Sequence, residues 1–273
     1  MAAPNEITPQ HLLHLIGTSN CPQIIDISIN PDFTDDLHLI PGASRHPHNG
    51  LQGLFTRLNG QPLVIICQKG IKLRQSKAAR LRSVVLRSEY LSSGNYGRCN
   101  PPQAPRTLSA NSPLMEQGHS LWITRHRPKT GPIDRPWLIR RFIDKYPHFL
   151  FVSTTEVIRV SERYNAIPFD TEDVFWHHRG ETCTFDTMLY EFGLRTPALV
   201  RLSIVVRAAA PDNHDLASEA AGLFALSVGL SRQYLGDIEQ LDADMNLYDA
   251  LYRYRWARDG TAERHTWPTG KPS

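Results

Sequence analysis

The chain has 273 residues and a mass of 30.9 kDa, with 41% hydrophobic and 21% charged residues. This composition is typical of a globular protein with a core and excludes a disordered polyelectrolyte. The net charge of +3 is too small for bulk nucleic-acid binding, and no apolar run reaches the roughly 18 residues of a membrane helix. The N-terminus lacks a secretory signal pattern, and four scattered cysteines without a CxxC pair indicate thiols in a reducing compartment. We therefore expect a cytoplasmic protein without a membrane partner.

Helices and strands alternate in the first part of the chain. Thr8 and Pro9 favour a helix start, because a threonine side chain can cap a helix and proline suits its first turn. Residues 23–28 (QIIDIS) and 63–67 (LVIIC) predict buried strands. Apolar residues at helical spacing follow, and then a short strand at residues 89–91. We expect an α/β layer fold over residues 1–98.

A proline-rich segment follows at residues 99–118. It contains four prolines, and proline removes a backbone donor and restricts the residue before it. We predict a semi-rigid linker here and a second domain over residues 119–273, of α+β class and richer in helix toward its end. The predicted elements are strands at residues 121–125 and 149–152 and helices at residues 137–146, 155–164, 184–192, 197–206, 216–230 and 231–256.

Cys67 ends an apolar strand and precedes a helix, in the segment CQKGIKLRQSKAARLR. Open α/β sheets bind ligands at the carboxyl ends of their strands. A tight loop followed by a helix N-terminus forms an anion site, and its field favours a thiolate over a thiol. Lys69 and Lys72 add positive charge, and Gly70 lets the backbone turn.

This segment resembles the active-site loop of rhodanese-type sulfurtransferases. IIDIS, IPGA and YLSSGNYG add to the resemblance, which covers roughly residues 8–98. It implies a rhodanese-like fold in which Cys67 takes sulfur from a small anionic donor, carries it as a persulfide and passes it to a thiol acceptor. Lys72 matches a catalytic basic residue of the family. The donor anion would be held by the loop after the cysteine, at Gln68, Lys69, Gly70 and Ile71.

The sequence departs from the family pattern at two positions. Lys72 stands where many members have arginine, and lysine balances charge without forming a bidentate fork. Ser28 also replaces an arginine, which removes an internal salt bridge to Asp26, the acidic residue of the first-strand motif. An inactive rhodanese-like module that serves in recognition is therefore an alternative, with Cys67 as a structural core residue.

A basic stretch opens the second part of the chain. Residues 121–145 hold seven Lys and Arg against two Asp. Arg140 and Arg141 lie on a predicted helix, and arginine in a cleft can bind an oxyanion bidentately. An oxyanion or phosphate pocket is one interpretation. The alternatives are a basic face with structural ion pairs and a nucleic-acid surface.

Polar side chains crowd between His177 and Asp186. His and Cys side chains ligate metals such as Zn²⁺, so His178, Cys183 and Asp186 offer a transition-metal site, although their spacing matches no zinc signature. The alternative is structural, with these side chains capping the helix from Thr184, a residue that can itself cap a helix running to Phe192.

The second part resembles the C-terminal domain of ChrB-type chromate-resistance proteins. The matches include PWLIRRFID, the run from His178 to Asp186, ALVRLSIVVRAA and YDALY, in the same order over roughly residues 119–256. The resemblance implies a regulator or accessory protein of chromate resistance, with chromate as a partner. Gly131, Pro132 and Arg135 stand where relatives have an Asp-Arg pair and a cysteine, which argues against a role resting on that cysteine.

Together the two resemblances predict a two-domain sulfurtransferase-like protein linked to oxyanion stress. The alternatives are a non-catalytic chromate-responsive sensor or transcriptional regulator, and an interaction module with an inactive rhodanese fold. Nucleic-acid binding is expected only for the regulator. A transition-metal ion in the second domain is the one cofactor considered.

Overall fold

A computed structural model describes residues 5–35, 38–50, 61–69, 71–83, 87–92, 120–126, 133–209 and 214–258. The predicted linker at residues 99–118, the glycine-containing segment after residue 92, Gly70, Gly131 and Pro132 lie outside the described residues. Among the described helices, none combines the length and apolarity that a membrane-spanning helix requires.

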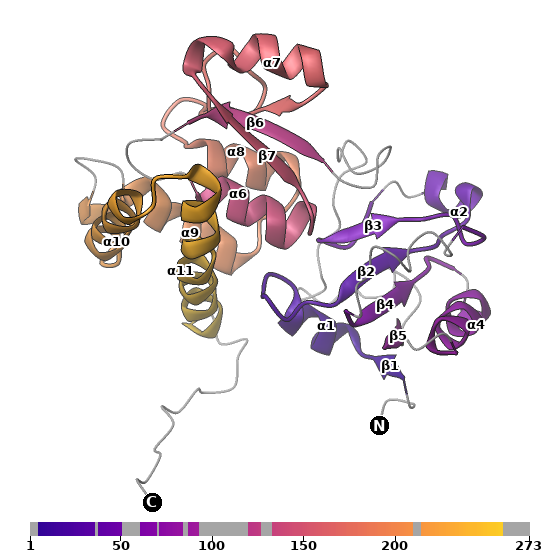
Figure 1. Ribbon diagram of the computed structural model, residues 1–273. Helices are drawn as coiled ribbons and strands as arrows, with labels where there is room; N and C mark the ends of the chain where they lie inside the picture. Colours follow the sequence, from indigo (N-terminus) through magenta and orange to yellow (C-terminus); the bar gives the residue numbers. More distant parts are fainter. Residues whose placement is uncertain are drawn as a thin grey trace, which may run out of the picture.

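The first part of the chain forms a five-stranded parallel sheet (Figure 1). Successive side chains of a strand point to opposite faces, and here both faces are buried. Ile24 and Val64 join one core cluster, whereas Ile25, Ile65 and Cys67 join another on the opposite face. The strands, in sheet order, are β1 (Glu6–Ile7), β5 (Ser88–Leu91), β4 (Leu63–Ile66), β2 (Gln23–Asp26) and β3 (Ala43–Arg45).

Helix α4 (Ile71–Arg82) covers the face of this sheet that includes Cys67. Its buried residues Ala78 and Leu81 pack with Ile25 and Ile65. Helix α1 (Pro9–Leu15) contributes Leu12 to the other cluster, and the hydroxyl of its N-cap, Thr8, accepts a hydrogen bond from the His11 amide at 3.2 Å. A third helix, α2 (Asn30–Asp35), follows β2.

The second part has its own parallel sheet, in the order β7-β6-β8. Its two faces belong to different core clusters. Trp122 packs in the large cluster, whereas Ile123 packs under helix α7 with Val157. In Figure 1, α7 lies on one side of this sheet and the remaining helices lie on the other. The strands are β6 (Leu121–Arg125), β7 (His148–Val152) and β8 (Ile167–Pro168), and α7 spans Val157–Tyr164.

Several helical segments of the described chain lie on the opposite side of that sheet, with the short 3-10 segment η4 (His214–Leu216) between α9 and α10 in the sequence. Helix α6 continues directly into the π-helical turn η2, so the helix widens by one residue per turn before it ends. Helices α9, α10 and α11 pack against one another. Their bounds are α6 (Asp134–Leu138), η2 (Ile139–Ile143), α8 (Thr184–Glu191), α9 (Pro197–Ala208), α10 (Ala220–Gln233) and α11 (Asp237–Arg258).

The two parts of the chain share one hydrophobic core. The large cluster runs from Ile24 and Val64 of the first sheet to Phe142 and Tyr252 of the second part. Gly17, at φ +81°, faces both of these aromatic rings, and a side chain there would overlap Phe142. Polar contacts also join the two parts, including a hydrogen bond from the Lys145 ammonium to the Cys21 carbonyl at 2.6 Å.

The mixed α/β architecture with parallel sheets and many helices confirms the predicted fold class in its coarse form, and most predicted elements lie where the sequence places them. The rhodanese-like fold of the first part stays a prediction. Two local predictions are wrong. The helix expected to reach residue 146 ends at Ile143, where the Asp144 amide bonds to the Ile139 carbonyl and the backbone turns extended. Thr184 does not cap α8, because Cys183 is the N-cap and the Thr184 hydroxyl donates to Asp170 instead, at 2.9 Å.

Candidate functional site

Cys67 follows β4 at the carboxyl end of the first parallel sheet, as predicted. Its side chain packs with Ile25 and Leu81 in the core cluster beneath α4 and is only 3% exposed. The cysteine therefore has the position of a site residue, but its sulfur is not open to solvent in this structure. None of the three described cysteines forms a disulfide.

A hydrogen-bonded chain fixes the backbone next to Cys67. The Gln68 amide donates to the Ser28 hydroxyl at 2.9 Å, and the Ser28 amide donates to the Asp26 carboxylate at 2.7 Å. All three residues are buried. Ser28 stands where many rhodanese-type sequences have an arginine. Here its hydrogen bonds connect the end of β2 to the start of the Cys67 loop.

Arg74 is a basic side chain that contacts the backbone of this cysteine. It lies in α4, is 0% exposed, and donates to the carbonyl oxygens of Cys67 at 3.5 Å and Ser92 at 3.0 Å. Its Nε has no hydrogen-bond partner. Burial lowers the pKa of Arg74, and the electrostatic influence of Cys67 opposes that shift. Among the described residues Arg74 forms no ion pair, and Glu6 and Tyr90 act on its pKa in the same direction as Cys67.

The two lysines predicted to hold or stabilise an anion near Cys67 are exposed. Lys69 is exposed and forms ion pairs with Asp35 at 2.7 Å and Asp32 at 3.3 Å, and the hydrogen bond to Asp35, followed by that to Asp32, raises its pKa. Lys72 is exposed on α4. Gly70 lies outside the described residues, and Ile71 is the first residue of α4. The anion-binding role of this loop stays a prediction.

Arg140 and Arg141 are both paired with carboxylates of α11. Arg141 donates two hydrogen bonds to Asp249, at 2.8 and 2.9 Å, and Arg140 donates one to Asp242 at 2.6 Å. Trp137 adds its indole N–H to Asp249 at 2.8 Å. Both arginines therefore form structural ion pairs, which is the alternative to the predicted oxyanion pocket.

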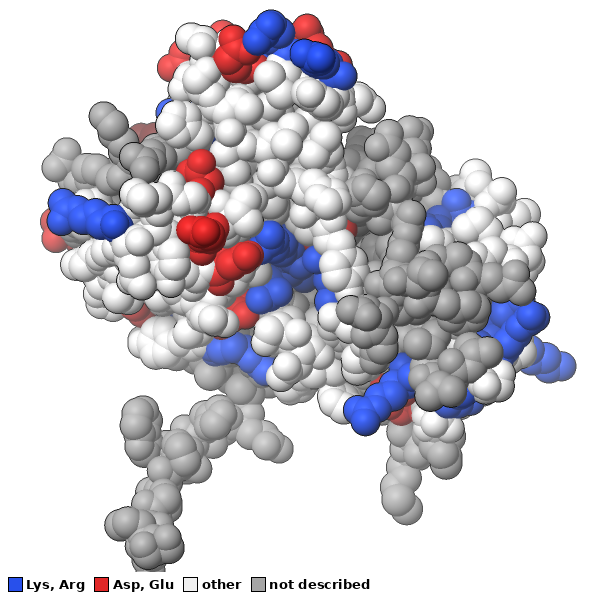
Figure 2. Space-filling model, viewed as in Figure 1, with Lys and Arg blue, Asp and Glu red and all other residues white. Residues whose placement is uncertain are grey.

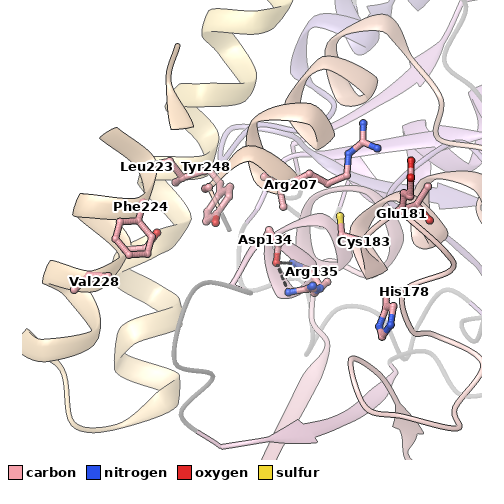
Figure 3. A pocket seen from close by; sticks show the side chains of 14 residues that line it. Asp134, Arg135, His178, Glu181, Cys183, Arg207, Leu223, Phe224, Val228 and Tyr248 are labelled. Carbon is pink, nitrogen blue, oxygen red and sulfur yellow. Dashed lines mark hydrogen bonds and ion pairs between the residues drawn. The ribbon is translucent and has the colours of Figure 1, made fainter. Parts of the chain in front are cut away.

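A pocket with a volume of about 290 Å³ opens in the second part, between α6, α8, α9, α10 and α11 (Figure 3). It has a charged side and an apolar side formed by α9 and α10. Sequence reasoning missed most of this set, since its members come from five segments. The residues that line the pocket include Asp134, Arg135, Cys183, Arg207, Phe224, Val228 and Tyr248.

Asp134 and Arg135 form a buried ion pair at the base of the pocket. The Asp134 Oδ1 accepts from the Arg135 amide at 2.8 Å and from its guanidinium at 3.1 Å, whereas Oδ2 has no partner. Arg135 also contacts Asp170 at 3.0 Å. Burial raises the pKa of Asp134 to about 6, with Asp170 and Asp186 acting in the same direction and Arg135 against it.

The three residues of the predicted metal site lie near one another without forming a cluster. Cys183 donates its thiol hydrogen to Asp186 at 3.2 Å, and burial, followed by Asp186, raises the pKa of Cys183 to about 12. Figure 3 shows the His178 ring and the Cys183 sulfur pointing in different directions. No group of three His, Cys, Asp or Glu side chains in the described part is placed to hold a metal ion. The metal site stays a prediction, and a neutral thiol disfavours it.

On the side seen in Figure 2, Lys and Arg side chains lie in separate groups, and Asp and Glu side chains lie close to several of them. Ion pairs in the second part of the chain include Arg179 with Glu191 at 2.5 Å and Arg255 with Glu219 at 2.6 Å.

Comparison with known proteins shows a similarity in the second part of the chain. Residues 122–255 match the family model described as ChrB, C-terminal domain. After that match, this region, with its small parallel sheet, pocket and surrounding helices, is named the ChrB-type domain. The chain is also homologous to Protein ChrB of Cupriavidus metallidurans, with 29% identity over 158 residues, 56% of this chain. The chain spans about half the length of that relative, 47% of which is covered.

Proposed function

We propose that this protein is a sulfurtransferase that acts in chromate resistance, with Cys67 as the carrier of a persulfide. The chromate part of the proposal is supported by the ChrB-type domain and the ChrB relative. The observation that supports the sulfur chemistry is the placement of Cys67 at the carboxyl end of β4, beside the buried guanidinium of Arg74.

The charge on Arg74 is the physical reason for this proposal. Burying a guanidinium is costly unless an anion lies near it. Arg74 forms no ion pair among the described residues, and Cys67, followed by Glu6, opposes the lowering of its pKa by burial. A thiolate or persulfide anion at Cys67 would supply that negative charge. Arg74, more than the exposed Lys72, is then the residue that stabilises the anionic sulfur.

The proposed reaction has two steps. The Cys67 thiolate attacks the outer sulfur of thiosulfate, a new S–S bond forms on the cysteine, and the S–S bond of thiosulfate breaks with its electron pair leaving on sulfite. A nucleophilic acceptor, such as a thiolate or cyanide, then attacks the outer persulfide sulfur. That step regenerates the Cys67 thiolate and releases a persulfide or thiocyanate, so atoms and electrons balance.

The first test is the intact mass of the full chain before and after incubation with thiosulfate. The proposal expects a gain of one sulfur atom on Cys67 and thiocyanate production when cyanide is added, both absent in Cys67→Ser. Cys183→Ser is the matched control and keeps both signals, because the Cys183 thiol stays protonated. A chain that never gains sulfur at Cys67 contradicts the enzymatic proposal.

The burial of Cys67 favours a second candidate, a non-catalytic module that serves in recognition. Nucleophilic attack requires the sulfur to meet its donor, and a side chain that is 3% exposed offers little surface for this. The two candidates differ in one measurement. The module alternative expects Cys67 to resist both thiosulfate and small alkylating reagents in the folded chain while the protein remains stably folded.

A further inference from the structure

The pocket of the ChrB-type domain combines a charged base with an apolar wall. Its volume of about 290 Å³ is near the lower limit of small-molecule pockets. The wall belongs to α9 and α10 and presents Val206, Leu223, Phe224 and Val228. The pocket lies in the second part of the chain, whereas Cys67 packs beneath α4 in a different core cluster. A ligand here is therefore independent of the proposed sulfur chemistry.

An unpartnered acceptor lies at the base of this pocket. Asp134 is 1% exposed, and its Oδ2 has no hydrogen-bond partner although its Oδ1 has two. A buried carboxylate oxygen without a donor is destabilising, because the water that it lost on folding has not been replaced. A ligand that donates a hydrogen bond to Oδ2 removes this deficit.

The charges around Asp134 favour a positively charged donor. Three carboxylates, Asp134, Asp170 and Asp186, face two guanidiniums, Arg135 and Arg207. Arg125, which is half exposed, approaches Asp170 at 3.7 Å, and Glu181 adds a carboxylate at the rim of the pocket. With these two side chains, four carboxylates face three guanidiniums, so the cluster has one negative charge in excess.

Two neutral groups complete the base. The Tyr248 phenol is buried, and burial, with Asp134 next, raises its pKa well above the ordinary value, so it stays protonated. The Cys183 thiol is neutral as well. The excess negative charge thus stays on the carboxylates.

We propose that this pocket binds a small organic cation, a primary ammonium compound with an apolar body. The ammonium group donates to Asp134 Oδ2, and the apolar body packs against the α10 wall at Leu223, Phe224 and Val228. The ammonium neutralises the excess negative charge of the buried cluster. One of its three N–H groups donates to Asp134 Oδ2, which otherwise has no hydrogen-bond partner. This binding site goes beyond the proposed function and does not depend on it.

Calorimetric titration of the full chain above neutral pH tests the ligand class. The probes are isoamylamine and phenethylamine, and the matched controls are isoamyl alcohol and phenethyl alcohol, which have the same bodies without the ammonium group. We expect the amines to bind and the alcohols to bind at least about tenfold more weakly, since a charge-assisted hydrogen bond is lost. Absence of amine binding, or equal binding of amine and alcohol, overturns the proposal.

Two variants test the site itself. Asp134→Asn removes the charge and is expected to weaken amine binding about tenfold or more, whereas Asp242→Asn, an exposed carboxylate on α11, leaves it unchanged. Val228→Trp fills the apolar side, leaves Asp134 intact and is expected to abolish binding. If Asp134→Asn does not fold, Val228→Trp decides the question, and unchanged amine binding in a folded Val228→Trp variant refutes the site.

Discussion

The two neighbouring arginines of η2 offer a matched test of what burial does to an ion pair. Asp249 of α11 accepts three hydrogen bonds, one from Trp137 and two from Arg141. The Arg141 and Asp249 side chains are 17% and 16% exposed, and Trp137 is fully buried. Asp249→Ala leaves both donors unpaired in a region where water reaches them poorly. The adjacent pair, Arg140 with Asp242, is the control because Asp242 is 63% exposed.

The magnitudes follow from these contacts. A hydrogen bond to a charged group contributes about 1.5–3 kcal/mol, and an unsatisfied buried donor costs about 1–3 kcal/mol. Because such terms are not additive, we expect Asp249→Ala to lower the free energy of unfolding by about 3 kcal/mol. Asp249→Asn keeps an acceptor for the indole and is expected to cost about 1–2 kcal/mol. Asp242→Ala is expected to cost less than about 1 kcal/mol, as exposed pairs do.

Urea-induced unfolding followed by circular dichroism measures these differences, provided that the slope with denaturant is unchanged among the variants. If Asp249→Ala and Asp242→Ala destabilise the protein equally, the reasoning from burial and hydrogen-bond count is refuted. An intermediate value for Asp249→Asn would show how much of the effect is charge and how much is the acceptor for Trp137.

Three further predictions concern the shared core and the pocket. Gly17→Ala places a side chain at φ +81° against Phe142 and Tyr252 and is expected to destabilise the protein by about 2–4 kcal/mol in urea unfolding; Gly222→Ala, which meets open space on α10, should instead be neutral or stabilising by up to about 1 kcal/mol. Burial raises the pKa of Asp134 from 3.8 to about 6, so the folded state binds its proton more tightly than the unfolded chain does. The resulting stability is present below the unfolded pKa and is lost as pH rises through about 6, and Asp134→Asn should remove this loss of roughly 3 kcal/mol over the interval. Cys183, with a pKa of about 12, should resist iodoacetamide at neutral pH in the folded chain and react after unfolding, as read by peptide mass mapping; rapid labelling of the folded chain would contradict the assigned protonation.

Local signals in the sequence predicted much of the first sheet and its helices. The runs QIIDIS and LVIIC became β2 and β4, the Thr8-Pro9 start became α1, and Gly17 ended that helix in a left-handed conformation. Strands β1 and β3 and helix α2 were not predicted, because two- and three-residue strands and a six-residue helix have too few residues for a periodic pattern. The placement of Cys67 after β4 followed from the same local pattern.

The partners of the charged residues could not be predicted in the same way. Arg141 meets a carboxylate 108 positions away, and Arg140 meets one 102 positions away, so the basic stretch that suggested an anion pocket is largely neutralised by α11. Arg74 lies only seven positions after Cys67, yet its complete burial depends on how α4 covers the sheet. A basic stretch of sequence does not predict a basic surface, because the folded structure decides which carboxylates pair with its basic side chains.

The sequence by itself determined the class of fold, the strand that delivers Cys67, and the ChrB-type nature of the second part, because these depend on local periodicity and on motifs in a fixed order. Only the tertiary structure decided that the cysteine is enclosed beneath α4, that the two parts share a core, and that Asp134 faces a pocket with an unpaired oxygen. Exposure, pairing and cavities arise from the packing of segments far apart in the chain, and no local pattern encodes them.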